Sequence, residues 1–317
     1  MNQNLKSHIA IIGANTIWGL NYVIAKGIIP DFLLPRAVVF FRVSGTVILF
    51  WILHFFLPSE KVEKKDLLKM ALCSVFGVVF NQILFFEGLN RTTPISASII
   101  ATGIPIFILI FSHFILKEKI TRVKVFGIMF GAAGALMIIL SAGAGDFRLN
   151  TLLGNFMILT SNASWALYLV LVKPLMEKYD YLTIIKWIFL FGSIIIFPYS
   201  FRIVASSPFA QIPFDIWMSI LFVVFIATGF AYCLVNYSLK TVSPNVNGIY
   251  IYLQPLVASL VAIILGKDKL TIIDFIAAVL IMAGVYFVTR RQNRRHCNFL
   301  KRKSEKRRDW RNRGRHD

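Results

Sequence analysis

Two ionisable side chains, Arg42 and Glu87, lie inside long apolar stretches of the sequence. A charge within hydrocarbon costs about 3 kcal/mol or more, so such residues are functional candidates by default. We expect both at a similar depth, where they could pair as a gate or clamp a charged substrate group. Glu87 could also take up a coupling proton if burial raises its pKa. The alternative is a snorkelling arginine and an interfacial glutamate that only satisfy each other.

Uncharged polar side chains in other apolar stretches predict a binding cavity, because an amide or hydroxyl in hydrocarbon must be hydrogen-bonded or face water. Pro105 and Pro255 each remove a helix hydrogen bond near the middle of such a stretch, so we expect a helix kink at each. The alternative is that the polar residues only tie helices together, at roughly 0.6 kcal/mol per bond. The residues that we predict to bind a solute are Trp18, Asn21, Thr102, Tyr250, Tyr252 and Gln254.

The remaining reactive side chains predict neither a metal site nor a cofactor. His54 and His113 are interpreted as interfacial residues, because no His, Cys or Asp cluster has the spacing of metal ligands. The three cysteines, Cys73, Cys233 and Cys297, are scattered, so no disulfide is expected.

Two further features concern packing and the membrane surface. Lys26, near the end of the first apolar stretch, is interpreted as snorkelling to lipid headgroups. Gly127 and Gly131 form a small-residue motif that allows close helix approach. We expect this motif to pack helices within the chain, and it leaves a homodimer open.

These residues sit in a chain built largely of apolar segments. Of its 317 residues, 57% are hydrophobic and 15% are charged, with a mean hydropathy of +0.70, whereas soluble domains carry roughly 25% charged residues. Runs of about 20 apolar residues are long enough to cross ~30 Å of hydrocarbon as helices. The composition therefore predicts an all-α integral membrane protein with ten transmembrane helices. The expected spans are residues 8–29, 35–57, 67–89, 94–116, 123–141, 151–172, 183–203, 213–239, 245–266 and 270–289.

The stretch between Arg91 and Thr121 contains a skeleton of residues that returns 150 positions later. Fainter matches relate the first and sixth spans at an offset of 147. We therefore predict two five-helix repeats, residues 1–145 and 146–289, followed by a basic, disordered tail at 290–317. Because each repeat holds an odd number of helices, the second is expected to be inverted relative to the first. The corresponding residues are Pro94 and Pro244, Pro105 and Pro255, Lys117 and Lys267, Thr121 and Thr271, and, at 147, Trp18 and Trp165.

Lys and Arg in the short loops predict that both termini are cytoplasmic, because basic residues gather on that side of a membrane. The tail carries thirteen Lys or Arg against three acidic residues, and we expect it to lie on anionic lipid. Basic arms also bind nucleic acid, but nothing else in the chain supports base recognition. The basic residues of the expected inner loops are Lys61, Lys64, Lys65, Lys69, Lys117, Lys119, Arg122, Lys124, Lys173, Lys178 and Lys240.

The chain resembles the EamA-like transporters of the drug/metabolite transporter (DMT) superfamily from residue 8 to about residue 289. The resemblance implies export of small organic metabolites, such as amino acids or drugs, across the inner (plasma) membrane. The sequence of this chain departs from the family's pattern at Gln254, where many relatives have Glu, so no titratable role is expected there. The motifs that carry it are Trp18-Gly-Leu-Asn21, Phe86-Glu-Gly-Leu-Asn90, Thr93-Pro94-x-x-Ala97, Pro105 and Lys117-Glu-Lys-Ile-Thr121, with the copies Gln254-Pro255 and Lys267-Asp-Lys-Leu-Thr271.

We predict a secondary active transporter, an efflux protein that works by alternating access at the interface of two inverted repeats. No Gly-rich phosphate loop for ATP occurs, so an ion gradient or the solute's own gradient would drive it. The alternative is a non-transporting membrane receptor or a membrane enzyme. An enzyme is not expected, because Glu87 and Asp274 are the only carboxylates within or at the edge of the apolar stretches and no histidine is expected at their depth.

Overall fold

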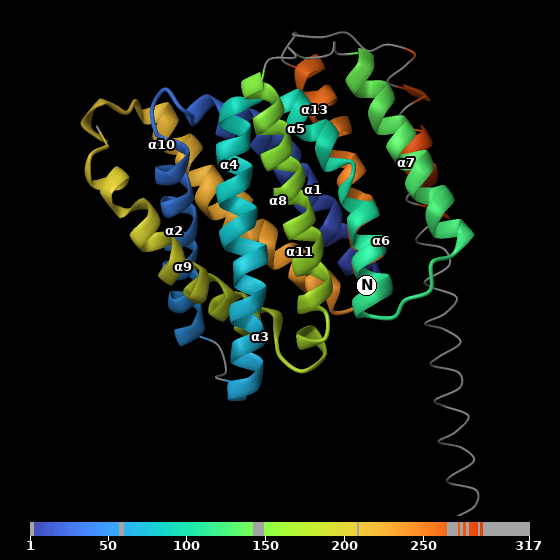
Figure 1. Ribbon diagram of the computed structural model, residues 1–317, viewed down its shortest axis with the longest axis horizontal. Coiled ribbons are helices and arrows are strands. Elements are labelled where there is room, and N and C mark those ends of the chain that lie inside the picture. The colour runs from blue at the N-terminus through green and yellow to red at the C-terminus, as the bar shows by residue number, and fades with distance from the viewer. Residues whose placement is uncertain are drawn as a thin grey trace, which may run out of the picture.

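The computed structural model describes residues 3–56, 60–141, 149–207 and 209–264, and beyond them residues 272, 275–276, 279–284 and 286–287. The regular structure of these residues is helical, and the helices lie side by side in one bundle (Figure 1). The bounds are α1 (Gln3–Ile28), α2 (Pro35–Phe55), α3 (Lys64–Ser74), η1 (Val75–Phe80), α4 (Asn81–Arg91), α5 (Pro94–Ala101), α6 (Ile104–Ile115), α7 (Arg122–Ser141), α8 (Leu149–Val172), η2 (Leu175–Glu177), α9 (Tyr181–Ala205), η3 (Phe209–Gln211), α10 (Phe214–Leu221), η4 (Phe222–Phe230), α11 (Ala231–Leu239), α12 (Pro244–Ile249), η5 (Tyr250–Tyr252) and α13 (Leu253–Ile264).

Six helical segments of the described chain are long and apolar enough to cross a membrane. They are Gln3–Ile28, Pro35–Phe55, Lys64–Arg91, Thr151–Glu177, Tyr181–Ala205 and Phe214–Leu239. Each overlaps one of the spans predicted from hydropathy, and α7 overlaps a seventh. Only eleven of the twenty residues of the tenth predicted span are described, and the predicted tail and Asp274 lie outside the described residues, so the count of ten helices stays a prediction.

The fourth and ninth predicted spans are helices broken near their middle. The fourth span is divided into α5 and α6 by Thr102 and Gly103. The ninth span passes from α12 to α13 through the 3-10 turn η5. Pro105 falls in the first turn of α6 and Pro255 in the first turn of α13. The backbone N–H groups of the first helical turn have no partner within the helix, so the N–H that proline lacks is not missed there. A proline at that position begins a new helix instead of kinking a continuous one. The prolines therefore mark breaks just upstream of themselves.

Two π-helical segments recur at the repeat offset. The segment η1 covers Val75–Phe80 between α3 and α4, and η4 covers Phe222–Phe230 between α10 and α11. Residues 75–80 plus 150 are residues 225–230, so both segments occupy corresponding places in the two repeats. A π segment misaligns backbone carbonyls and is frequent at functional sites.

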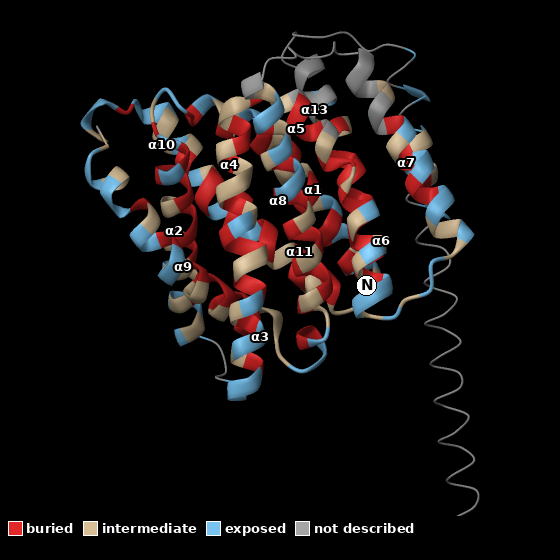
Figure 2. Ribbon diagram, viewed as in Figure 1, coloured by how far each residue is buried: buried red, intermediate tan, exposed pale blue. Residues whose placement is uncertain are grey.

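Many large hydrophobic side chains are exposed and many polar side chains are buried. Figure 2 shows how buried and exposed residues are distributed over the helices. Large hydrophobic side chains are exposed on the outer helices, for example Phe55 (83%), Phe114 (74%) and Phe214 (79%). Amide side chains such as Asn15 and Asn236 are buried. Exposed apolar side chains on this scale suit contact with lipid hydrocarbon and not with water.

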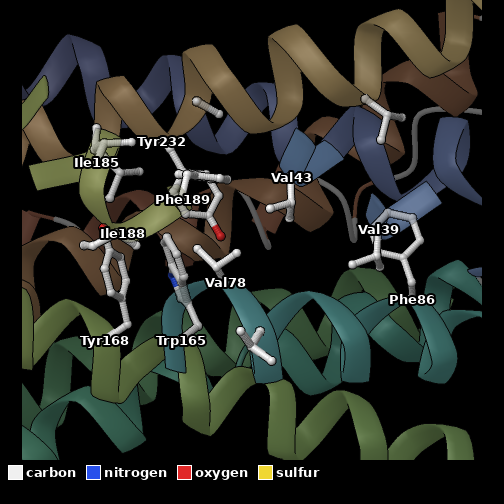
Figure 3. Close-up of a cluster of buried hydrophobic side chains, with 14 of the residues drawn as sticks. Val39, Val43, Val78, Phe86, Trp165, Tyr168, Ile185, Ile188, Phe189 and Tyr232 are labelled. Atoms are coloured by element: carbon white, nitrogen blue, oxygen red, sulfur yellow. The ribbon is translucent and has the colours of Figure 1, made fainter. Parts of the chain in front are cut away.

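Helices related by the two sequence offsets make matching contacts. Helix α1 packs against α11 and α13, and its counterpart α8 packs against α4 and α6. Helix α2 packs along α9, and these two helices are each other's counterparts. The close-up in Figure 3 shows buried side chains from α2, η1, α4, α8, α9 and α11.

Two lysines hold the ends of neighbouring helices in corresponding ways. The Lys26 ammonium donates to the carbonyls of Leu89 (2.7 Å), Asn90 (3.1 Å) and Thr92 (3.1 Å) at the end of α4. Lys173, its counterpart at an offset of 147, donates to the carbonyls of Leu239 and Val242 (3.4 Å) after α11. The interpretation of Lys26 as a snorkelling residue was wrong, because its ammonium neutralises helix-end carbonyls inside the bundle.

The small residues of α7 make a contact within the chain, as expected. A Cβ added at Gly284 would lie 2.6 Å from the Gly127 carbonyl oxygen and 2.8 Å from the Gly131 nitrogen. A Cβ at Gly131 would lie 2.2 Å from the ring of Tyr252. The missing side chains therefore let the backbone at Gly284 and the Tyr252 ring approach α7 closely.

Candidate functional site

A cavity lies at the centre of the bundle, with walls from both halves of the chain. About 80 Å³ of it is open to the centres of water molecules, which is room for several waters. Its walls come from α1, α2, α4, α6, α8, α11, η5 and α13. The lining residues are Trp18, Asn21, Tyr22, Arg42, Asn81, Gln82, Phe85, Ile104, Asn162, Trp165, Tyr232, Ile251 and Gln254.

Several amides in these walls have polar atoms without a partner. The side-chain oxygens of Asn21 and Gln82 and the side-chain nitrogen of Asn162 are buried and accept or donate no hydrogen bond among the described residues. Each such atom costs roughly 1–3 kcal/mol if nothing binds it. They therefore fit a bound polar solute or ordered water, which would restore these bonds.

Arg42 brings a positive charge to the cavity. Its side chain is 5% exposed, its Nε donates to Thr228 Oγ1 at 2.6 Å, and its guanidinium lies 4.9 Å from the centre of the Phe86 ring. Thr228 is itself fixed, because its hydroxyl donates to the Val223 carbonyl at 2.7 Å. None of the described carboxylates forms an ion pair with Arg42. The two terminal guanidinium nitrogens are thus available to an anionic group.

The π segments position the aromatic wall. Trp18 Nε1 donates to the Ala227 carbonyl in η4 at 2.9 Å, and the Tyr232 hydroxyl donates to the Gly77 carbonyl in η1 at 2.7 Å. Trp165 meets both rings, with centroids 5.2 Å from Trp18 and 5.1 Å from Tyr232. These hydrogen bonds satisfy backbone carbonyls that the π-helical geometry leaves misaligned. Together with the ring contacts, they fix the positions of three aromatic side chains around the cavity.

Three of the six residues predicted to bind solute line this cavity: Trp18, Asn21 and Gln254. The structure fixes the Gln254 amide, because its nitrogen donates to Asn15 Oδ1 at 2.9 Å. An amide that holds a neighbouring helix suits a neutral residue, in line with the uncharged role expected at this position.

The other three lie elsewhere. The Tyr252 ring packs against α7, where its hydroxyl donates to the Ile128 carbonyl at 3.1 Å. Tyr250 pairs with His8 through a 2.9 Å contact between its hydroxyl and Nδ1. Thr102 is buried in the break between α5 and α6. A 3-10 helix completes one turn in three residues, so its successive side chains point in different directions. In η5 this directs Ile251 into the cavity and the two tyrosines away from it.

Glu87 and Arg42 are not brought together. Glu87 instead accepts from Arg36 at 3.3 Å and from Arg91 at 2.7 Å. Its side chain is 15% exposed, against 45% for Arg36 and 29% for Arg91. Glu87 therefore links the start of α2 to the end of α4 through partly exposed ion pairs. Arg42 is more deeply buried.

Sequence reasoning missed much of the cavity wall, although the repeat contained a signal. Trp165 is the counterpart of Trp18 at an offset of 147, and Tyr232 is the counterpart of Gln82 at an offset of 150. If one member of such a pair faces the axis between two repeats, its counterpart is expected to face it too. Carrying Trp18 across the repeat would have found Trp165, whereas Gln82, the counterpart of Tyr232, was not among the residues predicted to bind solute.

Comparison with known proteins places the chain. A model of the EamA-like transporter family matches it twice, over residues 5–140 and 152–290. The chain belongs to the EamA-like transporter family. Family membership and the long apolar helices together identify a multi-pass membrane protein.

Several curated proteins are similar to the chain over most of their length. An "Uncharacterized transporter YyaM" of Bacillus subtilis is 25% identical over 89% of this chain and 93% of its own. An "Uncharacterized transporter" of Archaeoglobus fulgidus is 23% identical over 92% of this chain and 99% of its own. A "Probable terminal-alkyne amino-acid exporter" of Streptantibioticus cattleyicolor is 23% identical over 74% and 77%. A crystal structure with 18% identity and a TM-score of 0.70, covering 92% of this chain and 98% of that one, has the same fold.

Proposed function

We propose that this protein is a secondary active exporter that moves small organic solutes by alternating access between two inverted five-helix repeats. The central cavity supports this, because helices from both halves of the chain line it and hold buried amides without partners. Matching breaks, π segments and lysine caps at the repeat offsets support the duplication. We place the protein in the inner (plasma) membrane with both termini in the cytoplasm, as the loop charges predict.

The observation that carries the substrate class is the buried, unpaired charge of Arg42. We infer that the solute presents a carboxylate or a similar anionic group to this guanidinium. The described cavity walls hold no acid for an ammonium group, so the three rings and the amide oxygens would meet the rest of the solute. The relative named as an amino-acid exporter agrees with this, since an amino acid carries a carboxylate.

The test is transport in proteoliposomes loaded with pairs of solutes that differ only in charge, such as a carboxylic acid and its amide. Under an imposed pH gradient, we expect protein-dependent loss of the acid at a rate about tenfold or more above that of the amide. Equal loss of both members would keep the transporter and remove the anionic assignment. Loss that ignores the gradient would indicate a facilitator. Loss of neither from folded protein, across a panel of amino acids and other metabolites, would contradict transport itself.

We propose that the cluster of Glu87, Arg36 and Arg91 is a gate at the outer end of α2 and α4. Glu87→Gln keeps the shape of the side chain but leaves two arginines side by side without a counter-charge. Because exposed ion pairs contribute up to about 1 kcal/mol each, we expect transport to fall about threefold to tenfold while expression is kept. Glu63→Gln, which removes the partner of the exposed Lys65, is the matched control. Undiminished transport by Glu87→Gln would remove Glu87 from the mechanism.

A further inference from the structure

A second cavity lies between α2 and α9, near the end of α2 and the start of α9. About 370 Å³ of it is open to the centres of water molecules, more than in the central cavity. Its walls combine apolar side chains with one buried cation, Lys186. The lining residues are Phe50, Leu53, His54, Glu60, Asp180, Tyr181, Leu182, Thr183 and Lys186.

Lys186 resembles Arg42 in its burial and in its contact with an aromatic ring, and like Arg42 it has no ion pair among the described residues. It is 5% exposed, its ammonium lies 4.9 Å from the centre of the Trp51 ring, and among the described residues it has neither a hydrogen bond nor an ion pair. The buried indole nitrogen of Trp51 also has no hydrogen-bond partner. A buried ammonium without a counter-charge is costly unless something neutralises it.

The two acids that line this cavity are already engaged. Asp180 forms an ion pair with Lys240 at 2.5 Å and caps α9 by accepting from the Leu182 amide at 3.0 Å. Glu60 accepts from the Asp180 amide at 2.9 Å. Neither lies within ion-pair distance of Lys186, and Glu60 acts on the ammonium only through its more distant charge, so the ammonium can still bind a ligand.

The two cations lie at different levels along the pair formed by α2 and α9. Figure 3 shows Val39 and Phe86, which flank Arg42, at one end of the buried cluster and Ile185 at the other. At the repeat offset of 147, Lys186 falls on Val39, one helical turn from Arg42. Each repeat therefore contributes one buried cation at nearly equivalent positions.

An aromatic layer separates the two cavities. Phe189 lies one turn beyond Lys186 on α9, and its ring centre is 5.9 Å from Phe50 of the second cavity and 5.0 Å from Tyr232 of the central one (Figure 3). Phe189 therefore packs between one wall residue of each cavity.

We propose that Lys186 forms a second anion-binding site, which takes a carboxylate or phosphate group at the end of the bundle predicted to face the cytoplasm. This proposal rests on the proposed function only for the identity of the ligand, a transported acid. The acid would bind Lys186 on one side of Phe189 and Arg42 on the other. A lipid headgroup offers the same chemistry to the same site.

Fluorine NMR of protein labelled with 5-fluorotryptophan tests this, because Trp51 reports on Lys186 whereas Trp18 and Trp165 report on the central cavity. The probe is benzoate, with the neutral benzamide as its control, in phosphatidylcholine nanodiscs at constant ionic strength. We expect benzoate, but not benzamide, to shift the Trp51 resonance saturably. Lys186→Gln is expected to weaken this response at least about tenfold, while Lys186→Arg keeps it.

Arg202→Gln, an exposed residue on the same helix, is the matched control and should change nothing. Arg42→Gln should suppress the response of Trp18 and Trp165 and leave that of Trp51. A Trp51 resonance that moves when phosphatidylglycerol is added, and then ignores benzoate, would uphold the anion site and assign it to lipid. A Trp51 resonance that moves with neither ligand, in protein whose other resonances are native, would overturn the proposal, whether or not transport is found.

Discussion

Arg42→Gln is expected to lower the transport of an organic acid by about a hundredfold, with little change for a neutral analogue. Glutamine can still reach Thr228, but it removes the charge and the two nitrogens that face the cavity. A hydrogen bond to a charged group contributes about 1.5–3 kcal/mol, and every 1.4 kcal/mol is a factor of ten. The measurement is the initial rate of acid and amide efflux from the same proteoliposomes.

The loss should reside in substrate binding and not in folding. The variant removes a buried cation that has no counter-charge, so we expect its thermal stability to match or exceed that of the parent protein. Arg42→Lys keeps the charge but not the planar fork, and should recover only part of the activity. Arg202→Gln is the matched control for loss of an exposed arginine. If Arg42→Gln transports acid and amide as the parent does, the anionic substrate class is wrong.

Hydropathy and the internal repeat predicted the elements of this fold because the membrane imposes them. A helix that crosses hydrocarbon must be long and apolar, so its bounds are visible in the sequence alone. Pro105 and Pro255 indicated irregularity in these two helices, but each was predicted to kink its helix, whereas the structure has a break just upstream of each proline. These features depend on local sequence and on the solvent.

The cavity was less predictable because it depends on which way each helix faces. Trp18 and Asn21 could be predicted from polarity on an apolar helix, but Tyr252 could not, since the 3-10 turn rotates it towards α7. The π segments that direct Trp18 and Tyr232 have no sequence signature of their own. Arg42 was expected to pair with Glu87 from depth alone, and depth does not show that Glu87 pairs with Arg36 and Arg91.

The contacts of Lys26 likewise could not be predicted from its position in the sequence. Its substitution is expected to have the largest effect on the stability of this protein. Lys26→Met keeps the aliphatic stem of the side chain and removes the ammonium that binds three carbonyls at the end of α4. We expect the free energy of unfolding to fall by about 3 kcal/mol, because hydrogen bonds to a charged donor are lost and buried carbonyls are left without partners. The measurement is reversible denaturation of purified protein in detergent micelles.

Lys6→Met, at an exposed position on the same helix, is the matched control and should be nearly neutral. The counterpart Lys173→Met removes the equivalent cap after α11 and should cost a similar amount. Because the two lysines hold different helix ends, the losses in the double variant should add. If Lys26→Met is as stable as Lys6→Met, the ammonium reaches lipid headgroups after all and α4 ends without its help. A loss for Lys26 alone would mean that only the first repeat depends on its cap.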